Sequence, residues 1–310
     1  MASGMTVKRY LLLAFVVVVS TYLLLSFMQT PPYHGPSISL PARELDHSYV
    51  PRRKLDIVIA TYREDLHELS THLTAISLLP NIASLDANII VYTKDANASA
   101  DSILDHVSAD HIVHLPNRGR EGGTYLTHII ENWDDLAEHT LFIQAEIHNF
   151  GHFQRRLLEY FVPETGMLSL GFGGITCNLT DCTDPWNWHD DAGHLPRMYE
   201  EIYERPAPAE ALLLSYKGQF IVSGKRIRSL NRYYYEYLRE ILESNKSAYS
   251  GKKSGTSAGN APRFGYTLER AWGLIFGCAD GRIAVECPGY WHRKAGGEDV
   301  GSYDAWRSIV

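Results

Sequence analysis

Short apolar segments alternate with segments of helical periodicity over residues 55–144, and this alternation constrains the fold more than any other feature of the chain. The apolar segments are short and rich in β-branched residues, which is typical of buried strands. They are 55–60 (LDIVIA), 88–92 (NIIVY), 111–115 (HIVHL) and 140–144 (TLFIQ). Helical periodicity is found between them, at 66–79, 99–107 and 124–133. The alternation predicts an α/β fold in which a Rossmann-like, mostly parallel sheet is covered by helices on both faces.

Ligands bind to such sheets beyond the carboxyl ends of the strands, so the segments that follow the strands are the first candidates for a site. Three of them lie at this edge: 61–65 (TYRED), 93–95 (TKD) and the residues after Gln144. We therefore expect a binding site to be built from these segments.

The segment 117–123 (NRGREGG) connects the third strand to a helix that is expected to begin near Thr124. Gly122 and Gly123 allow a close approach of the backbone, and a helix N-terminus offers free N–H groups to an anion. Arg118 and Arg120 add positive charge. The segment predicts a phosphate cradle. The alternative is an ordinary turn with a solvated Arg-Glu pair. The spacing of the glycines matches neither a dinucleotide fingerprint nor a P-loop, so neither of those folds is indicated.

Two groups of residues could bind a metal ion. Glu146 and His148 alternate at the end of the fourth strand and are expected to point the same way, so that they could hold one divalent ion such as Mn²⁺ together with phosphate oxygens. His152 could assist, and the alternative is a polar strand end. A second possible metal cluster occurs in the segment 186–194 (WNWHDDAGH), at His189, Asp190, Asp191 and His194. That segment is interpreted first as a wall of an acceptor site, since tryptophans stack on sugar faces, and alternatively as a structural loop.

The C-terminal third contains a predicted strand at 218–223 (GQFIVS), a long helix at 225–244 and another helix at 266–277 (YTLERAWGLIFG). Glu269 and Arg270 are charged residues within that apolar helix, and burying them is unfavourable unless they are paired. Either the two residues form a structural pair, or Glu269 faces a cleft and acts as a base.

The N-terminus contains an uncharged run of 19 residues, 10–28, which is long enough to span a bilayer as one helix. A cleaved signal peptide is the alternative, but its apolar region is shorter and is followed by a small-residue cleavage site. Lys8 and Arg9 precede the run and the next basic residue is Arg43, which predicts a cytosolic N-terminus and a luminal C-terminal part. The expected organisation is a cytosolic N-terminus at 1–9, a signal anchor at 10–28, a stem at 29–54 and a luminal α/β domain at 55–310.

Cysteines and glycosylation motifs agree with a luminal compartment. The close pairs Cys177/Cys182 and Cys278/Cys287 favour two local disulfides, although four cysteines allow three pairings. Acceptor motifs for N-glycans occur at three asparagines: Asn97, Asn178 and Asn245. The predicted location is therefore the Golgi or the endoplasmic reticulum, as a type II membrane protein. The net charge of −7 does not favour a nucleic-acid partner.

The segments VIATYRED, VYTK, LPNRGREGGTYLTHIIENWDDL, LFIQ, GQFIVS and LERAWGLIFG together resemble an uncharacterised fungal family, domain of unknown function 3431. The resemblance covers roughly residues 55–278 and is most specific over 117–136. The family itself implies no activity.

The layout is more distantly similar to that of GT-A nucleotide-sugar glycosyltransferases. Those enzymes usually carry Asp-x-Asp at the mid-chain strand end, where this chain has Glu146 and His148. The similarity implies that Glu269 faces the acceptor as the catalytic residue, and that the segments after the strands bind the donor. The substrate-binding residues expected on these grounds are Thr61, Tyr62, Arg63, Lys94, Arg120, Glu121, Gly122 and Gly123.

The first hypothesis for function is accordingly a membrane-anchored glycosyltransferase of the secretory pathway, with a nucleotide-sugar donor, an unknown acceptor and Mn²⁺ as the metal. The second is a non-catalytic binding or assembly protein on the same fold. The third is a metal-dependent hydrolase that uses His148, His152 and the segment 186–194. Turnover of a donor distinguishes the first from the second, and hydrolysis without a nucleotide indicates the third.

Overall fold

The structure is a computed structural model that describes residues 40–41, 43–171, 174–244 and 263–280. The chain divides into two units, Met1–Gly35 and Pro36–Val310, and every described residue belongs to the second. The predicted anchor at 10–28 lies outside the described residues. Within the described ranges, no helix has the length and the apolar character that crossing a membrane requires.

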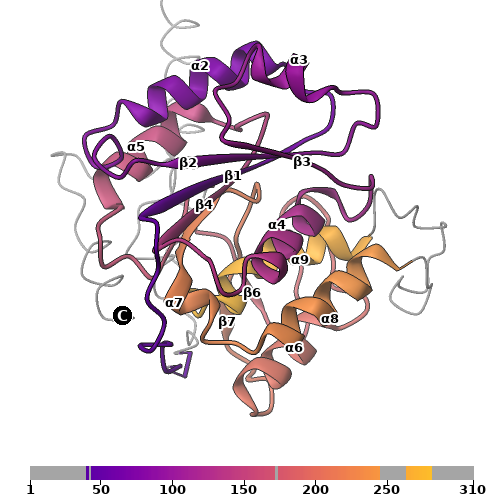
Figure 1. The fold of residues 1–310 in the computed structure, drawn as a ribbon. Helices are drawn as coiled ribbons and strands as arrows, with labels where there is room; N and C mark the ends of the chain where they lie inside the picture. The colour runs from indigo at the N-terminus through magenta and orange to yellow at the C-terminus, as the bar shows by residue number, and fades with distance from the viewer. Residues whose placement is uncertain (1–39, 42, 172–173, 245–262, 281–310) are drawn as a thin grey trace, which may run out of the picture. The chain divides into compact units, whose positions relative to one another are not determined.

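A six-stranded sheet, in the order β3-β2-β1-β4-β8-β5, forms the centre of the second unit (Figure 1). Its first four strands are parallel, whereas β8 is antiparallel to both β4 and β5. The strands are β1 (Leu55–Thr61), β2 (Asn88–Thr93), β3 (His111–His114), β4 (His139–Gln144), β5 (Met167–Ser169) and β8 (Phe220–Ser223). The mostly parallel α/β sheet predicted from the alternation is therefore confirmed. The antiparallel direction of β8 could not be predicted from the alternation.

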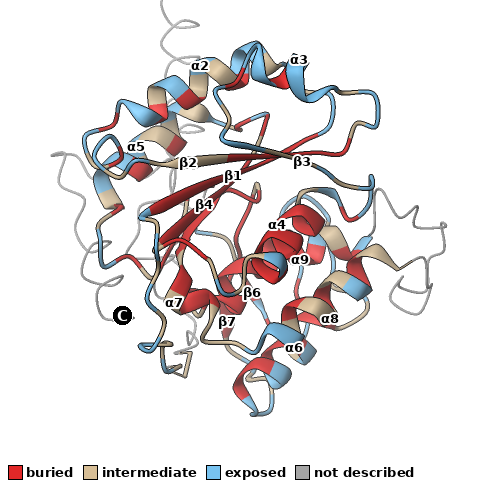
Figure 2. Ribbon diagram, viewed as in Figure 1, coloured by how far each residue is buried: buried red, intermediate tan, exposed pale blue. Residues whose placement is uncertain are grey.

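Helices cover both faces of this sheet, and buried side chains fill the space on each side (Figure 2). Neighbouring residues of β1 point to opposite faces: Val58 packs in one core cluster, and Ile57 and Ile59 pack in the other. The helices on the Ile57 side are α2 (Leu66–Ser77), α3 (Ala100–Leu104) and α5 (Phe150–Tyr160). Those on the Val58 side are α4 (Arg120–Glu131), α6 (His194–Tyr203), α7 (Gly224–Ile227), α8 (Arg232–Glu243) and α9 (Arg263–Ile275). A two-stranded antiparallel sheet, β6 (Thr176–Asn178) with β7 (Ala211–Leu213), completes the described elements.

The long helix predicted over 225–244 is wrong, because the segment forms the two helices α7 and α8. Asn231 begins the second of them with an extended backbone, and its side chain accepts a hydrogen bond from Tyr233 N at 2.9 Å. Asparagine is a favoured N-cap residue because its side chain satisfies a backbone N–H that has no partner within the helix. The helical periodicity runs through both helices, but the extended backbone and the capping hydrogen bond of Asn231 separate them.

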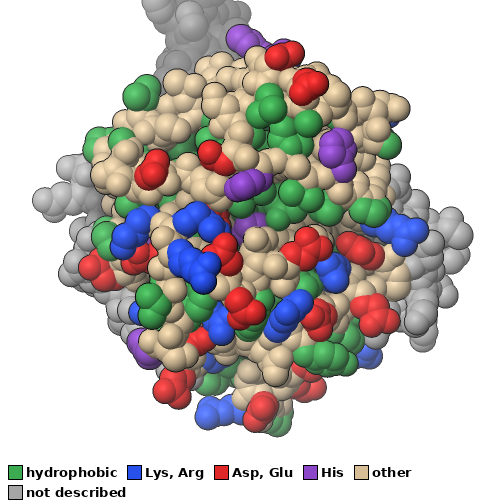
Figure 3. All heavy atoms as spheres, in the orientation of Figure 1, with side chains coloured by type: hydrophobic (Ala, Val, Ile, Leu, Met, Phe, Trp, Pro, Cys, Tyr) green, Lys and Arg blue, Asp and Glu red, His purple; other side chains and the backbone are tan. Residues whose placement is uncertain are grey.

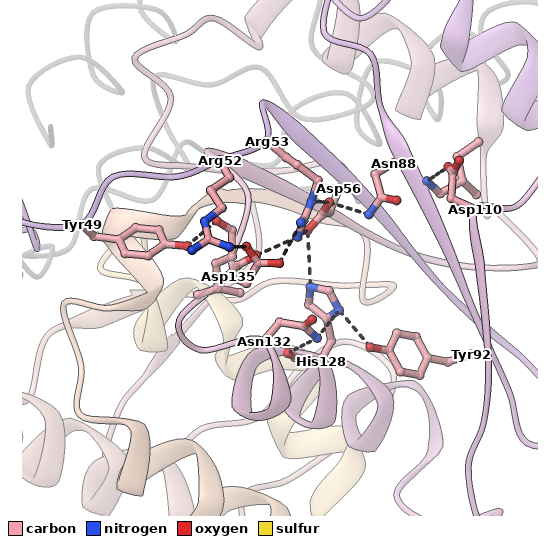
Figure 4. Close-up of polar contacts among 12 residues, drawn as sticks. Tyr49, Arg52, Arg53, Asp56, Asn88, Tyr92, Asp110, His128, Asn132 and Asp135 are labelled. Carbon is pink, nitrogen blue, oxygen red and sulfur yellow. Dashed lines mark hydrogen bonds and ion pairs between the residues drawn. The ribbon is translucent and has the colours of Figure 1, made fainter.

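A buried polar network ties the amino-terminal ends of the strands together (Figure 4). The carboxylate of Asp56, in β1, is fully buried and accepts hydrogen bonds from Arg53 Nε at 3.0 Å and from Asn88 Nδ2 at 2.9 Å. His128 of α4 lies next to it, with its Nε2 4.0 Å from Asp56 Oδ2 and its Nδ1 3.0 Å from the hydroxyl of Tyr92. These contacts connect α4 to the amino-terminal end of β1 through Asp56 and to the carboxyl-terminal half of β2 through Tyr92.

We predict that His128 makes the protein less stable as the pH falls. Its pKa is lowered from 6.5 to about 4, mainly by burial. Above pH 6.5 the histidine is neutral in both states, but below it the unfolded chain binds a proton that the folded chain does not, so the free energy of unfolding decreases. Urea unfolding at pH 7 and pH 4.5 should show a loss that is about 2–3 kcal/mol smaller in His128→Gln than in the parent. His139 and His152, whose pKa values are also lowered, remain in both proteins. Equal pH dependence in parent and variant would contradict the prediction.

Candidate functional site

The order of the strands reverses between β1 and β4. From β1 the chain proceeds outward through β2 to β3, and it then returns to place β4 on the other side of β1. Open α/β sheets bind ligands at such a switch point, outside the carboxyl ends of the two strands. Ala60 pairs with Gln144 there, so the residues that follow the two strands begin side by side.

Residues 61–63, predicted to line a nucleotide pocket, leave the sheet at this switch point. Thr61 is buried, and its hydroxyl donates to Glu64 Oε2 at 2.9 Å. Tyr62 and Arg63 are exposed, and the guanidinium carbon of Arg63 lies 4.8 Å from the centre of the Tyr62 ring. Arg63 Nε is also paired with Asp95 Oδ2, at 3.1 Å, after β2. The loop therefore presents one aromatic ring and one arginine to solvent, while Thr61 has a structural role.

Helix α4 begins at Arg120, four residues before the predicted start near Thr124. Gly119 and Arg120 both have a positive φ, of 68° and 48°. The ammonium group of Lys94 donates to the carbonyl oxygens of Arg118, at 2.5 Å, and of Arg120. Burial lowers the pKa of Lys94 to about 8. Lys94, predicted to bind substrate, thus contacts the backbone that leads into α4 and holds it in this conformation.

Gly122 and Gly123 lie inside α4 and are buried, so they do not form the turn of a phosphate cradle as predicted. A Cβ atom on Gly122 would lie 2.8 Å from Leu268 Cδ2 in α9. One on Gly123 would lie 3.0 Å from the carbonyl oxygen of Arg118. The two glycines therefore allow α9 and the preceding loop to pack closely against α4, and a side chain at either position would require its neighbour to shift.

A strained turn before β8 collects polar contacts from three elements. Lys217 and Gly218 have φ values of 70° and 55°, which is unfavourable for the lysine. Lys217 N donates to Glu269 Oε1 at 2.7 Å, and Gln144 Nε2 donates to the Lys217 carbonyl at 2.8 Å. The hydroxyl of Tyr125 donates to the Gly218 carbonyl at 2.9 Å. The turn is thus fixed from α9, β4 and α4, and it holds one oxygen of the Glu269 carboxylate in place.

Arg120, Glu121 and Glu269 form a charged group beside this turn. Arg120 is 40% exposed, its Nε lies 3.6 Å from Glu121 Oε2, and its guanidinium carbon lies 5.3 Å from the ring centre of Tyr266. Burial raises the pKa of Glu121, the charge of nearby Glu269 raises it further, and Arg120 opposes both effects. The site therefore contains two carboxyl groups in different environments, one mostly buried and one held by a backbone N–H. Acid and base roles are commonly divided between groups of this kind.

Charges of both signs are interspersed on the face of the molecule seen in Figure 3, which carries no extended patch of one sign.

Glu146 and His148, the predicted metal ligands, do lie near each other. Glu146 Oε1 is 4.0 Å from His148 Nδ1, and the two side chains are 66% and 35% exposed. Buried Gln219 holds the segment by accepting from His148 N at 2.8 Å and donating to the His148 carbonyl at 3.2 Å. With bonds of about 2.1 Å, two adjacent ligands of one ion lie about 3.0–3.4 Å apart, so the two exposed side chains would have to move closer to each other to bind a common ion.

His152 does not complete a third ligand. Among the described residues, no group of three or more His, Cys, Asp and Glu side chains could hold an ion. Burial, with the nearby charges of Arg156 and Arg155, lowers the pKa of His152 to about 4. Within the part of the chain that the structure describes, no residue adds a third ligand to Glu146 and His148.

The second predicted metal cluster does not form either. Asp190 caps α6, where its carboxylate oxygens accept from His194 N at 3.0 Å and from Leu195 N at 2.7 Å. Asp191 Oδ2 lies 3.6 Å from Arg263 Nη2. These contacts use the aspartates for the structure of the loop, whereas the loop itself lines a pocket against α9, as a substrate-site wall would.

Arg270 is paired mainly with Asp184, a residue that the sequence analysis missed. Asp184 Oδ2 accepts from Arg270 Nε at 2.9 Å and from Nη2 at 2.5 Å, and both side chains are buried. Asp184 Oδ1 also accepts from Trp186 N at 2.9 Å and Trp188 N at 3.1 Å. The predicted partner Glu269 lies farther from Arg270, at 3.6 Å. The Asp-Pro dipeptide at 184–185 was a turn signal that could have drawn attention to this position.

The predicted disulfide between Cys177 and Cys182 is confirmed. Cys278 is a free, buried thiol whose pKa is raised to about 12 by burial, and Cys287 lies outside the described residues. Asn97 and Asn178 are exposed, as glycan acceptors must be, while Asn245 lies outside the described residues.

Comparisons with known proteins place the chain in a family. No curated protein sequence matches it significantly. Among solved structures, a crystal structure of 4-diphosphocytidyl-2C-methyl-D-erythritol synthase is similar, with 11% sequence identity and a TM-score of 0.30. The match covers 73% of this chain and 99% of that one, and a likeness of this degree carries no information on activity. The family model described as "Protein of unknown function (DUF3431)" matches residues 57–293, and the chain belongs to that family.

Proposed function

We propose that the protein is a membrane-anchored glycosyltransferase of the secretory pathway that uses a nucleotide-sugar donor on a GT-A-like fold. The observation that carries the proposal is the reversal of strand order between β1 and β4. It starts the 61–63 loop and the segment with Glu146 from neighbouring strands, at the edge where such sheets bind ligands. Fold analogy raises the expectation of this chemistry, and the residues at the edge supply its parts.

Exposed cationic groups at this edge would bind the phosphate oxygens of the donor. Arg63 and Arg120 are each partly exposed and each stacks on a tyrosine ring, so a planar guanidinium is held ready for phosphate oxygens. The Tyr62 ring offers an aromatic surface next to Arg63. Lys94 positions Arg120 through the backbone and does not contact the donor.

Glu269 is proposed as the general base. In the reaction, the acceptor hydroxyl oxygen forms a bond to the anomeric carbon of the donor while the bond from that carbon to the diphosphate breaks. The electron pair of the broken bond goes to the diphosphate, and the hydroxyl proton goes to Glu269. Lys217 N–H fixes one oxygen of Glu269 and the other lies 3.6 Å from Arg270 Nη1, so the carboxylate is oriented before the acceptor binds. Glu121 remains protonated to higher pH than an ordinary glutamate, because its pKa is raised.

Glu146 and His148 would hold a divalent ion such as Mn²⁺, which supplies positive charge to the leaving diphosphate when it is bound. Their donor atoms lie 4.0 Å apart, so a small rotation of these exposed side chains would bring both to one ion, and the other positions would be left to donor oxygens and water. The described residues do not assemble the third ligand that a hydrolytic metal site would need, so the hydrolase hypothesis has less support.

The experiment is a thermal-shift screen of nucleotide sugars against the full chain, with and without Mn²⁺. A donor present at 1,000 times its Kd should stabilise the protein by about 4 kcal/mol. Arg120→Ala should weaken that donor about 10–150-fold, which corresponds to a charge-assisted hydrogen bond of about 1.5–3 kcal/mol. Glu146→Gln, which keeps the shape and removes the charge, should abolish the effect of Mn²⁺.

Arg232→Ala is the matched control, because Arg232 is 46% exposed and paired with Glu236 at 3.0 Å, much as Arg120 lies beside Glu121. It should leave donor binding unchanged. If Arg120→Ala and Glu146→Gln bind every tested nucleotide sugar like the parent, the carboxyl edge is not the donor site.

The proposal also includes a type II orientation, with the anchor at 10–28 and the domain at 55–310 in the lumen. The motive is the placement of Lys8 and Arg9 before the apolar run. In sealed microsomes, protease should leave a C-terminal tag intact until detergent is added, and Asn97 and Asn178 should carry glycans. Digestion of the tag without detergent would show that the C-terminal part faces the cytosol and would contradict the predicted orientation.

A further inference from the structure

A pocket of about 210 Å³ lies between the loop 187–194 and the first turns of α9. A cavity of about 150 Å³ binds benzene, so this pocket has room for a single six-membered ring with its substituents. Aromatic and hydrogen-bonding side chains both line it, among them Trp188, His189, Asp191, Arg263, Tyr266 and Thr267. The pocket thus combines aromatic rings with hydrogen-bonding groups on one concave surface.

The loop that forms one wall is held rigidly before any ligand binds. The disulfide between Cys177 and Cys182 closes its approach, and Asp190 N donates to the Cys182 carbonyl at 3.0 Å. Asp184 binds the backbone of the loop on one side and Arg270 of α9 on the other. Asp190 then fixes the far end by capping α6. A wall that is already ordered loses little conformational freedom when a ligand binds, which favours affinity for a small ligand.

The other wall leads directly to the proposed reaction centre. Tyr266 lines the pocket, and its ring carries the guanidinium of Arg120 at 5.3 Å. Glu269 follows Tyr266 by three residues on α9, which is one helical turn, so the two side chains lie on the same side of the helix. Tyr266 thus contacts both the pocket and Arg120, and Glu269 lies one turn farther along α9, outside the residues that line the pocket.

We propose that this pocket is the acceptor subsite and that it takes one pyranose unit of a carbohydrate. This inference rests on the proposed function, since it names the second substrate of that reaction. A pyranose ring has apolar C–H faces that suit the rings of Trp188 and Tyr266. Its hydroxyl groups both donate and accept, and they suit a carboxylate, an imidazole and a guanidinium, which the pocket offers at Asp191, His189 and Arg263. A purely apolar ligand would displace water from these polar groups without replacing its hydrogen bonds, which is unfavourable.

The test measures carbohydrate binding and donor binding separately. The full chain is prepared in a detergent whose headgroup contains no sugar, and a panel of methyl hexopyranosides is screened by saturation-transfer NMR without any nucleotide. The variant is His189→Ala with Asp191→Ala, since both side chains are exposed and neither is part of the core. Trp186→Ala is the control: it changes a 56% exposed tryptophan in the same segment that does not line the pocket.

At least one methyl hexopyranoside should bind the parent, and the double variant should weaken it by tenfold or more. Trp186→Ala should bind it like the parent, and donor affinity should stay within twofold in all three proteins. Binding that is equal in parent and double variant, or no binding by any member of the panel, would overturn the assignment of the pocket. Carbohydrate binding that depends on the pocket in a protein that binds no nucleotide sugar would support the carbohydrate site and overturn the transfer reaction instead.

Discussion

Replacing Glu269 with glutamine should lower the turnover number by about 10²–10⁴-fold, which is the usual contribution of a positioned general base. Glutamine has the same shape, and its carbonyl oxygen still accepts from Lys217 N, so the strained turn at 217–218 should persist. The amide cannot take the acceptor proton. Donor affinity should therefore change little while the chemical step slows, which single-turnover kinetics with a bound donor would separate.

Glu240→Gln is the control for this substitution, because Glu240 is an exposed glutamate of α8. It should retain the kinetics of the parent. The melting temperature of Glu269→Gln should stay within a few degrees of the parent, as for a change of about 0.5–1 kcal/mol. A turnover number within tenfold of the parent would remove Glu269 from the chemistry, even if the donor still binds.

Asp184→Ala should destabilise the fold by about 3–5 kcal/mol, because it leaves the buried guanidinium of Arg270 without its main counter-charge. For a domain of this size the melting temperature should fall by about 6–20 °C. Burial acts to raise the pKa of the Asp184 carboxyl, but its hydrogen bonds with Arg270 and with two backbone N–H groups hold the pKa below the usual value. The stability that this group contributes is accordingly present above the unfolded pKa and is lost in acid, as the pH falls through the folded pKa.

Two comparisons isolate this effect. Asp191→Ala removes a half-exposed carboxylate of the same loop, whose contact with Arg263 is 3.6 Å long, and it should change stability by less than about 1 kcal/mol. Combining Asp184→Ala with Arg270→Met removes both buried charges and should recover part of the loss. If Asp184→Ala melts like the parent, the pair does not connect the loop to α9 in solution.

Much of the sheet could be predicted from the sequence, for a physical reason that applies to β1, β2 and β4. Each is a short apolar run that is buried over most of its length because the strand is covered, and such runs are visible locally. The edge strand β3 is exposed or half-buried, and only its apolar pair Ile112 and Val113 marks it. The start of α4 could not be predicted in this way. Gly122 and Gly123 locally indicate a turn, and only the close approach of Leu268 to the first and of the Arg118 carbonyl to the second explains glycines inside a helix.

In the candidate site, too, some residues could be recognised from the local sequence, whereas the contacts between distant residues could not. Arg120, Glu146 and Glu269 could be named from the sequence because charge next to an apolar segment is conspicuous. The hydrogen bond from Lys217 N to Glu269 joins residues 52 positions apart, and the Asp184–Arg270 pair joins residues 86 positions apart. Neither partner is marked by spacing, so the turn that holds Glu269 and the ion pair that holds the loop emerge only when the chain is folded.

The most direct test of a glycosyltransferase is the mass of an acceptor after incubation. The full chain, in a detergent whose headgroup contains no sugar, would be mixed with Mn²⁺, one nucleotide sugar at a time and a methyl hexopyranoside that binds it, and products would be measured by mass spectrometry. With at least one donor, the acceptor should gain the mass of one sugar unit and release an equal amount of nucleotide diphosphate, and Glu269→Gln should do neither at a comparable rate. If no donor yields either product while the protein is folded and binds the acceptor, the protein does not transfer sugars and the central claim is wrong.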